Sequence, residues 1–171
     1  MKRLFTIILF AFMLVTIGYA QGEVKRVYDE KANPMEQIDR ALEQAKAQNK
    51  YVVCQVGGNW CPWCLLLADY IEKDSVVSKM IADNYVWIHV NYHPRRSAKS
   101  AMAEQTKAMM KRLGNPHRFG YPVLVVLNEQ GQVIHTQDSG LLEEGKGYNH
   151  DKVVSFLKAW TPVAVKKAQE M

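Results

Sequence analysis

The chain has 171 residues, of which 48% are hydrophobic and 23% are charged, with three cysteines and a formal net charge of +5. This length corresponds to one domain, the composition excludes a disordered chain, and three cysteines are too few for a small domain stapled by disulfides. The charge is modest and no run of Lys or Arg exceeds two residues, so the sequence does not predict nucleic-acid binding.

The N-terminal segment has the pattern of a secretory signal peptide. The first three residues carry two positive charges, residues 4–17 form an apolar run, and small residues precede a cleavage site after Ala20. An uncleaved membrane anchor is the alternative, but a run of 14 residues is shorter than the roughly 20 that a helical span needs. We therefore expect residues 1–20 to be removed and residues 21–171 to form one exported domain, periplasmic or secreted.

The mature part begins with a helix and a buried strand. Asn33, Pro34 and Glu36 supply a cap residue, a proline at the first helical position and a glutamate at the third, which together predict a helix over 34–49. The short apolar run 51–56 predicts a buried strand. The elements expected next are a helix over 61–73, a further helical segment over 75–82, a strand over 85–90 and a helix over 98–113.

The C-terminal half is dominated by a strand at 123–127, Val-Leu-Val-Val-Leu. Its apolar residues are continuous, which predicts that both faces are covered. A turn then leads to an antiparallel partner strand over 132–137. A glycine-rich loop over 139–147 precedes a helix over 151–160 and a short helical tail. This order, a helix followed by β-α-β-α-β-β-α, predicts an α/β fold with a central sheet covered by helices on both faces.

One motif carries the chemistry: Trp60-Cys61-Pro62-Trp63-Cys64, between the first strand and the next helix. At a helix start, free backbone N–H groups and the positive end of the helix dipole favour a thiolate on Cys61. We expect Cys61 to be the exposed thiol. Cys64 lies nearly one turn further on, more buried, where it can attack a mixed disulfide formed by Cys61. The sequence therefore predicts a catalytic Cys61–Cys64 pair.

Other roles for this pair fit less well. A zinc site normally needs four ligands, and only Cys54 and five scattered histidines are available, none with paired spacing. Haem attachment would require a histidine where Leu65 stands. A structural disulfide remains an alternative because exported proteins use them, although so small a loop removes little chain entropy. We expect redox chemistry without a metal or an organic cofactor.

At this point the sequence resembles the thioredoxin superfamily over about residues 34–160. The resemblance rests on the cysteine motif, on the order of the elements and on Phe119-Gly120-Tyr121-Pro122, which leads into the 123–127 strand. It implies a three-layer sandwich with a central mixed sheet, helices on both faces and an extra N-terminal helix. The closest likeness is to exported members with an added N-terminal helix and a similar cysteine motif.

The resemblance also implies a substrate-binding surface. A cis peptide bond at Pro122 would face the cysteines, the backbone beside Pro122 would pair with a substrate peptide, and Tyr121 would border the thiolate. Trp60, Pro62 and Trp63 flank the thiols, and we expect them to bind substrate as well. The alternative for Pro122 is an ordinary proline at the edge of a strand.

Two positions depart from the family pattern. Many thioredoxins carry a buried acid six residues before the first cysteine, where this chain has Gln55, which cannot titrate. The dipeptide between the cysteines, Pro62-Trp63, differs from the Gly-Pro of typical thioredoxins and looks closer to the Pro-Tyr of glutaredoxins. The reduction potential is therefore open over the family's range, from about −270 mV to about −120 mV.

Taken together, the residues and the resemblance predict an extracytoplasmic thiol–disulfide oxidoreductase that reduces, oxidises or isomerises protein disulfides. We expect it to act as a monomer on protein disulfide substrates and to exchange electrons with a membrane-linked reductant or oxidant. Two alternatives remain: a peptide-binding module without turnover, and a metal chaperone that uses Cys61 and Cys64. The third cysteine, Cys54, lies within an apolar strand and is expected to be a buried spectator.

Overall fold

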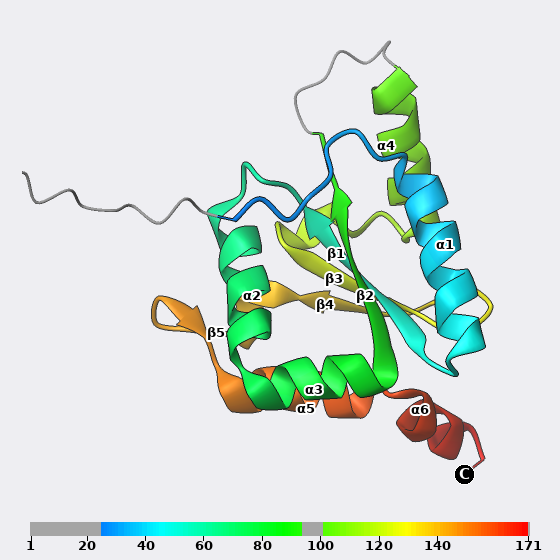
Figure 1. Ribbon diagram of the computed structural model, residues 1–171, viewed down its shortest axis with the longest axis vertical. Coiled ribbons are helices and arrows are strands. Elements are labelled where there is room, and N and C mark those ends of the chain that lie inside the picture. The colour runs from blue at the N-terminus through cyan, green and yellow to red at the C-terminus, as the bar shows by residue number, and fades with distance from the viewer. Residues whose placement is uncertain (1–24, 94–100, 171) are drawn as a thin grey trace, which may run out of the picture.

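The computed structural model describes residues 25–93 and 101–170 (Figure 1). The expected signal peptide, residues 1–20, and the first three residues of the helix expected over 98–113 lie outside the described residues. Within the described part of the chain, no helix is long and apolar enough to cross a membrane.

A mixed four-stranded sheet forms the centre of the molecule (Figure 1). Its strands are β1 (Tyr51–Gly57), β2 (Tyr85–Asn91), β3 (Val123–Leu127) and β4 (Val133–Asp138), in the order β2-β1-β3-β4. Strand β1 runs parallel to β2 and antiparallel to β3, and β4 returns antiparallel to β3. Every residue of β3 is buried, as its uninterrupted apolar run predicts.

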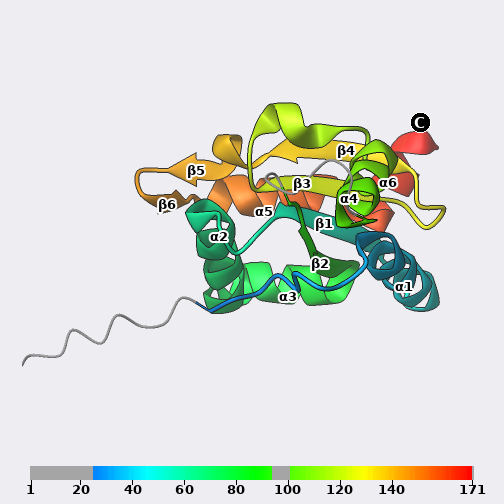
Figure 2. The same ribbon diagram turned by 90° about the horizontal axis from the view of Figure 1, so that it is seen from above.

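Helices cover both faces of this sheet (Figures 1 and 2). On one face, α1 and α4 pack against the sheet, and on the other face α2, α3 and α5 do so. The six α-helices of the described residues are α1 (Pro34–Ala47), α2 (Pro62–Lys73), α3 (Ser75–Asn84), α4 (Ala101–Arg112), α5 (His150–Ala159) and α6 (Pro162–Gln169), and a 3₁₀ helix spans Pro116–Phe119. The predicted α/β sandwich with an N-terminal helix is therefore confirmed.

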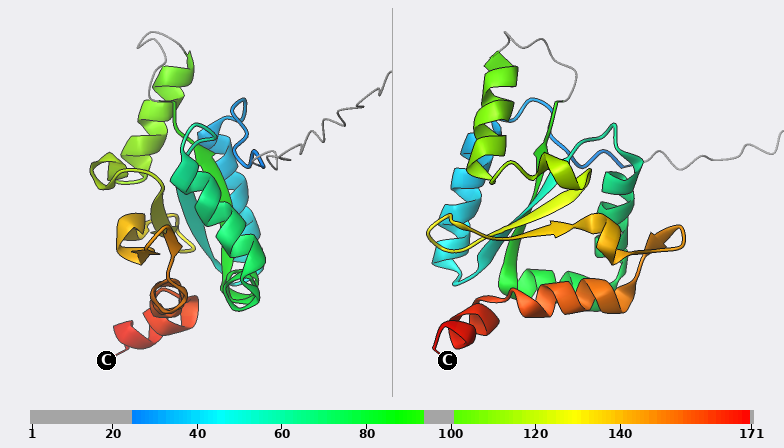
Figure 3. Two further views of the ribbon diagram at one scale, coloured as in Figure 1. Left: turned by 90° about the vertical axis from the view of Figure 1, so that its left-hand side faces the viewer. Right: turned by 180° about the vertical axis from the view of Figure 1, so that it is seen from behind.

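The segment predicted as a glycine-rich loop contains more structure than its composition indicates. A 3₁₀ turn, Ser139–Leu142, leads into a hairpin of two short strands, β5 (Glu143–Glu144) and β6 (Gly147–Tyr148). Strands of two residues are too short to show an alternating pattern in a sequence. The hairpin lies beside α2, as Figure 3 shows from behind.

Neighbouring residues of β1 point into the two different helix layers, and this places Cys54 and Gln55 on opposite faces of the sheet. Successive residues of a strand point to opposite faces of the sheet. Cys54 packs into the core beneath α1 and α4. Gln55 therefore points to the other face, where it bonds to Cys64 and Trp87. The sheet thus separates the free cysteine from the cysteine motif.

Candidate active site

The two cysteines of the motif lie at the N-terminus of α2, just beyond the end of β1. They form a disulfide whose Cα atoms are 5.2 Å apart. Cys61 is the N-cap residue of α2, and its Sγ accepts a hydrogen bond from the backbone N–H of Cys64 at 3.2 Å. The same N–H and the positive end of the helix dipole would stabilise a thiolate on Cys61.

Two glycines before the motif allow this close packing. A Cβ on Gly57 would lie only 2.4 Å from Cys64 Sγ, and a Cβ on Gly58 would lie 2.3 Å from Nε1 of Trp60. Neither position has room for a side chain. In the sequence these glycines mark the end of a strand, whereas in the structure they bring the backbone of β1 against the disulfide.

The Tyr121–Pro122 peptide bond is cis, as predicted. The carbonyl oxygen of Tyr121 lies 3.5 Å from Cys61 Sγ, so the loop before β3 meets the cysteine pair although 60 residues separate them in the chain. The carbonyl of Pro122 accepts a hydrogen bond from the Ser139 hydroxyl at 2.6 Å. This bond ties the proline loop to the turn that follows β4.

Little of either cysteine is open to solvent in the disulfide form. Cys61 is 5% exposed and Cys64 is 0% exposed. The expected order, with the second cysteine more buried, is present, but Cys61 is less exposed than its position in the sequence predicts. The reason is tertiary, because the side chain of Tyr121 packs against the cysteine pair from the opposite loop.

An aromatic cluster borders the disulfide on one side. Trp60 is 48% exposed, donates its indole N–H to the carbonyl of Tyr92 at 3.0 Å, and meets the ring of Tyr121 edge-on at 5.5 Å. The ring of Tyr92 stacks on Tyr121 at 4.8 Å. Tyr92 was not singled out in the sequence, because it follows a strand with no motif around it.

Trp63 lies on the other side of the motif and is partly covered. Its ring meets that of Tyr148 at 5.8 Å and 90°, and the Tyr148 hydroxyl donates to the Trp63 carbonyl at 3.2 Å. Tyr148 belongs to β6, so the small hairpin supports the start of α2. The two tryptophans of the motif therefore do not form one continuous open surface.

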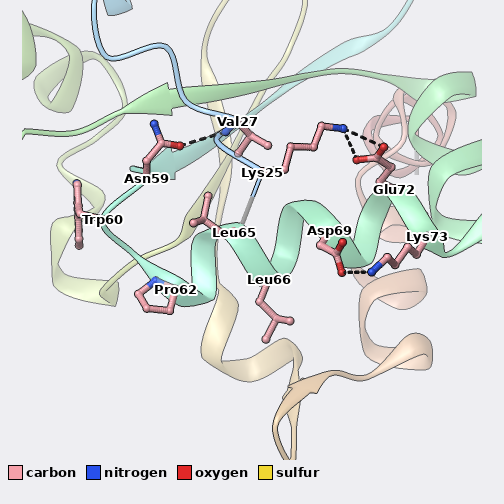
Figure 4. Close-up of a pocket in the computed structure, with 10 residues that line it drawn as sticks. All are labelled: Lys25, Val27, Asn59, Trp60, Pro62, Leu65, Leu66, Asp69, Glu72 and Lys73. Carbon is pink, nitrogen blue, oxygen red and sulfur yellow. Dashed lines mark hydrogen bonds and ion pairs between the residues drawn. The ribbon is translucent and has the colours of Figure 1, made fainter. Parts of the chain in front are cut away.

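A groove of about 710 Å³ runs from Trp60 along the outer side of α2 (Figure 4). Its lining combines apolar and charged side chains, and its far end is flanked by two ion pairs, Lys25–Glu72 and Lys73–Asp69. The other lining residues are Val27, Asn59, Pro62, Leu65 and Leu66. Of the predicted substrate-binding residues, Trp60 and Pro62 lie in this groove, while Trp63, Tyr121 and Pro122 lie outside its lining.

Gln55 occupies a buried position behind the cysteines and is 0% exposed. Its Nε2 donates to the Cys64 carbonyl at 2.9 Å and to the Tyr28 hydroxyl at 2.8 Å. Its Oε1 accepts the indole N–H of Trp87 at 3.2 Å. The Gln55 amide, the Trp87 indole and the Cys64 carbonyl do not titrate. The Tyr28 hydroxyl is neutral at ordinary pH as well, because burial raises its pKa well above its usual value.

The N-terminal segment contributes a residue that sequence reasoning missed. Tyr28 is 4% exposed and packs against Cys61 and Cys64. Asn59 holds the segment in place, since its Oδ1 accepts the N–H groups of Val27 and Tyr28 at 3.1 Å and its Nδ2 donates to the Tyr28 carbonyl at 2.8 Å. Tyr28 lies in an irregular stretch before the first helix, where the sequence carries no periodicity or motif.

The third cysteine is separate from this site. Cys54 is a free thiol, 0% exposed, and burial raises its pKa to about 12. In the described ranges, 25–93 and 101–170, no group of three His, Cys, Asp or Glu side chains is arranged to hold a metal ion.

Comparison with known proteins identifies the family. Residues 13–170 match the model of the family Thioredox_DsbH, described as "Protein of unknown function, DUF255". The chain belongs to this family. This Thioredox_DsbH protein is similar in structure to a disulphide isomerase from Xylella fastidiosa Temecula1, with a TM-score of 0.63 and 22% identity over 80% of this chain and 97% of that one. It is also similar to a structure titled DsbH Oxidoreductase, with a TM-score of 0.52 and 20% identity over 71% of this chain and 78% of that one.

No curated protein matches the sequence. The two structural likenesses establish the fold, and the family match confirms that this Thioredox_DsbH chain is a member of the thioredoxin superfamily. The family and the Cys61–Cys64 pair at the start of α2 support thiol–disulfide oxidoreductase activity.

Proposed function

We propose that the protein is an exported thiol–disulfide oxidoreductase that acts on the disulfides of other proteins. One observation carries the proposal: the Cys61–Cys64 disulfide lies at the N-terminus of α2, with the Tyr121 carbonyl 3.5 Å from Cys61 Sγ. The helix start stabilises a thiolate on the first cysteine. The backbone of the proline loop lies where it can pair with a peptide beside that thiolate.

In the reducing direction the chemistry has two steps. The Cys61 thiolate attacks one sulfur of the substrate disulfide, and the other substrate sulfur leaves as a thiolate and takes up a proton. Cys64 then attacks Cys61 Sγ, which breaks the mixed disulfide and releases the second substrate thiol. Two electrons pass to the substrate and the protein is left with the Cys61–Cys64 disulfide. The reverse sequence oxidises a substrate dithiol.

The binding roles are assigned by position. Tyr121 and Pro122 present backbone groups beside Cys61, while Trp60 and Pro62 extend an apolar surface from the disulfide into the groove along α2. We propose that an extended, partly apolar segment of an unfolded protein binds there. Trp63 contributes less contact area, because Tyr148 covers its ring.

The cellular setting follows from the N-terminal pattern and the chemistry. Residues 1–20 have the features of a secretory signal, so we propose that the protein acts outside the cytoplasm. We propose that it acts there as a monomer. There it requires a membrane-linked partner to restore the Cys61–Cys64 pair after each turnover. One structural relative is titled a disulphide isomerase and the other an oxidoreductase, which supports substrates that are themselves protein disulfides.

The test uses the mature chain and three variants. We expect the wild-type protein to catalyse reduction of a model protein disulfide by dithiothreitol, and Cys61→Ser to abolish it. Cys64→Ser should still attack and should accumulate mixed disulfides that are visible on non-reducing gels. Cys54→Ala is the matched control, since it removes a thiol on the opposite side of the sheet.

Two results would contradict the assignment. Adducts trapped by Cys61→Ser, with none in Cys64→Ser, would reverse the roles of the two cysteines. A folded wild-type protein that binds unfolded substrate but does not catalyse disulfide exchange would contradict the proposed activity and favour a peptide-binding module without turnover. A glutathione titration of the Cys61–Cys64 pair then gives its reduction potential, which decides between a reducing and an oxidising role.

A further inference from the structure

Cys64 must become a thiolate in an unfavourable place. It is 0% exposed, and burial disfavours the charged form of a thiol. The neighbouring polar side chain from β1 is Gln55, which cannot take up a proton. A thiolate formed at Cys64 during resolution therefore needs a hydrogen-bond donor from another part of the chain.

The Tyr28 hydroxyl is placed to be that donor. A Cβ built on Gly57 would lie 2.4 Å from Cys64 Sγ and 3.0 Å from Tyr28 Oη, so the sulfur and the oxygen both lie close to the same point beside Gly57. Tyr28 also packs in one buried cluster with Cys61 and Cys64. Asn59 fixes the backbone of Tyr28 through three hydrogen bonds, so the hydroxyl is held rather than free to move away.

The hydrogen-bond pattern around Gln55 determines how the Tyr28 hydroxyl is oriented. The indole N–H of Trp87 can only donate, and the Cys64 carbonyl can only accept. The Gln55 amide must therefore turn its oxygen to Trp87 and its NH₂ group to Cys64 and Tyr28. Tyr28 Oη accepts from Gln55, and its own hydrogen remains to be donated. In the disulfide form, this hydroxyl donates no hydrogen bond to a nitrogen, oxygen or sulfur atom of the described residues.

We propose that Tyr28 donates a hydrogen bond from its hydroxyl to the thiolate of Cys64 and so assists the step in which Cys64 resolves the mixed disulfide. This inference rests on the proposed exchange function. In that step a bond forms between the two cysteine sulfurs and the bond from Cys61 to the substrate breaks. The departing substrate sulfur gains the proton that Cys64 loses, through water. Tyr28 keeps its proton, consistent with a pKa that burial raises.

The test compares Tyr28→Phe with Tyr85→Phe, both in a Cys54→Ala background. Tyr85 is a matched control because it is buried and its hydroxyl donates to the Leu157 carbonyl at 2.6 Å, in the core away from the cysteine cluster. With Ellman's reagent, the reduced protein should release one thionitrobenzoate when Cys61 attacks and a second when Cys64 resolves. We expect Tyr28→Phe to slow the second release about tenfold and to leave the first unchanged.

A second readout does not depend on turnover. In a chain that also carries Cys61→Ala, the pKa of Cys64 is followed through its ¹³Cβ shift against pH. Loss of a hydrogen bond to a charged group should raise this pKa by about one unit or more in Tyr28→Phe, with no rise in Tyr85→Phe. If Tyr28→Phe does not fold, Asn59→Ala, which releases the segment that holds Tyr28, should raise the pKa in the same direction.

Different failures separate the two proposals. An unchanged Cys64 pKa and an unchanged second release in folded Tyr28→Phe would overturn the role of Tyr28 while leaving the exchange function intact. Equal changes in Tyr85→Phe would also overturn it, because the effect would then be one of general stability. A wild-type protein that never releases the second thionitrobenzoate would instead contradict the exchange function.

Discussion

At the scale of single residues, burial controls the reactivity of the Cys54 thiol. It lies in the core beneath α1 and α4, and its pKa of about 12 leaves almost no thiolate at neutral pH. We predict that Cys54→Ala keeps full turnover and lowers the free energy of unfolding by about 1 kcal/mol. Alkylation of the folded, reduced protein should label Cys61 first and Cys54 only after denaturation.

This prediction fails if Cys54 is labelled rapidly in the folded protein. A Cys54-linked dimer that forms in air would contradict it as well, because an odd cysteine in an exported protein can pair between molecules. Mass spectrometry of the labelled peptides distinguishes the three cysteines.

His89 is a second residue whose behaviour depends on burial. It stands beside Gln55 on β2, its ring meets that of Tyr28 edge-on at 5.3 Å, and its Nε2 has no hydrogen-bond partner among the described residues. Burial lowers its pKa to about 4. The unfolded chain therefore binds a proton on His89 near pH 6.5, whereas the folded chain does so only near pH 4.

Since the unfolded state binds more protons between these values, stability must fall as the pH falls from about 6.5 to about 4. We predict that His89→Leu makes the decrease in the free energy of unfolding on acidification smaller by about 2 kcal/mol. Urea unfolding at pH 7 and pH 4.5, for wild type and variant, measures the difference. The same pH dependence in both proteins would assign the loss to other groups.

At the scale of elements, the junction between α2 and α3 depends on one side chain. Asp74 ends α2 and caps α3, with its Oδ1 accepting the N–H groups of Val76 and Val77 at 3.0 Å. Its other oxygen accepts from His150 at 2.7 Å, which joins the start of α5 to this junction. The Val77 N–H and then His150 lower the pKa of Asp74 to about 2.

We predict that Asp74→Ala lowers the free energy of unfolding by about 1–2 kcal/mol at pH 7. The carboxylate stabilises the fold above about pH 4 and loses this effect as the pH falls towards 2, because its folded pKa is the lower one. The variant and wild type should therefore converge in acid. Asp69→Ala, which removes an exposed ion pair with Lys73, is the control and should cost less than about 0.5 kcal/mol. A cost as small for Asp74→Ala would mean that the junction does not need its cap.

At the scale of the whole molecule, both helix layers pack on one sheet and share the strands β1, β2 and β3. We predict a single cooperative unfolding transition, because the two helix layers share these three strands. Tryptophan fluorescence reports on the cysteine motif and the α2 layer, while far-UV circular dichroism reports on every helix. The two curves should coincide in urea. Two separated transitions would show that the α1 and α4 layer unfolds independently.

The parts of the fold that were predicted well are those with a local physical cause. The start of α1 follows from Asn33, whose side chain caps the Met35 N–H at 3.0 Å, and the strand β3 follows from an apolar run that the structure buries completely. The hairpin of β5 and β6 was missed because its strands are too short for a pattern. The helix ends that the structure describes moved by at most two residues, as is usual where the last turn has few hydrogen-bond partners.

For the candidate site, the sequence by itself determined the cysteine pair and its place at a helix start, because the pair is a short motif next to a recognisable element. That the proline loop faces this pair was implied by the resemblance to the thioredoxin superfamily, and the structure confirms it. Only the tertiary structure decided what surrounds the pair. Tyr28, Tyr92 and Tyr148 lie in three separate segments: Asn59 holds Tyr28 in place, Tyr92 follows β2 and stacks on Tyr121, and Tyr148 meets Trp63 from the small hairpin. Periodicity and motifs describe neighbours along the chain, whereas these contacts depend on which strands and loops meet in space.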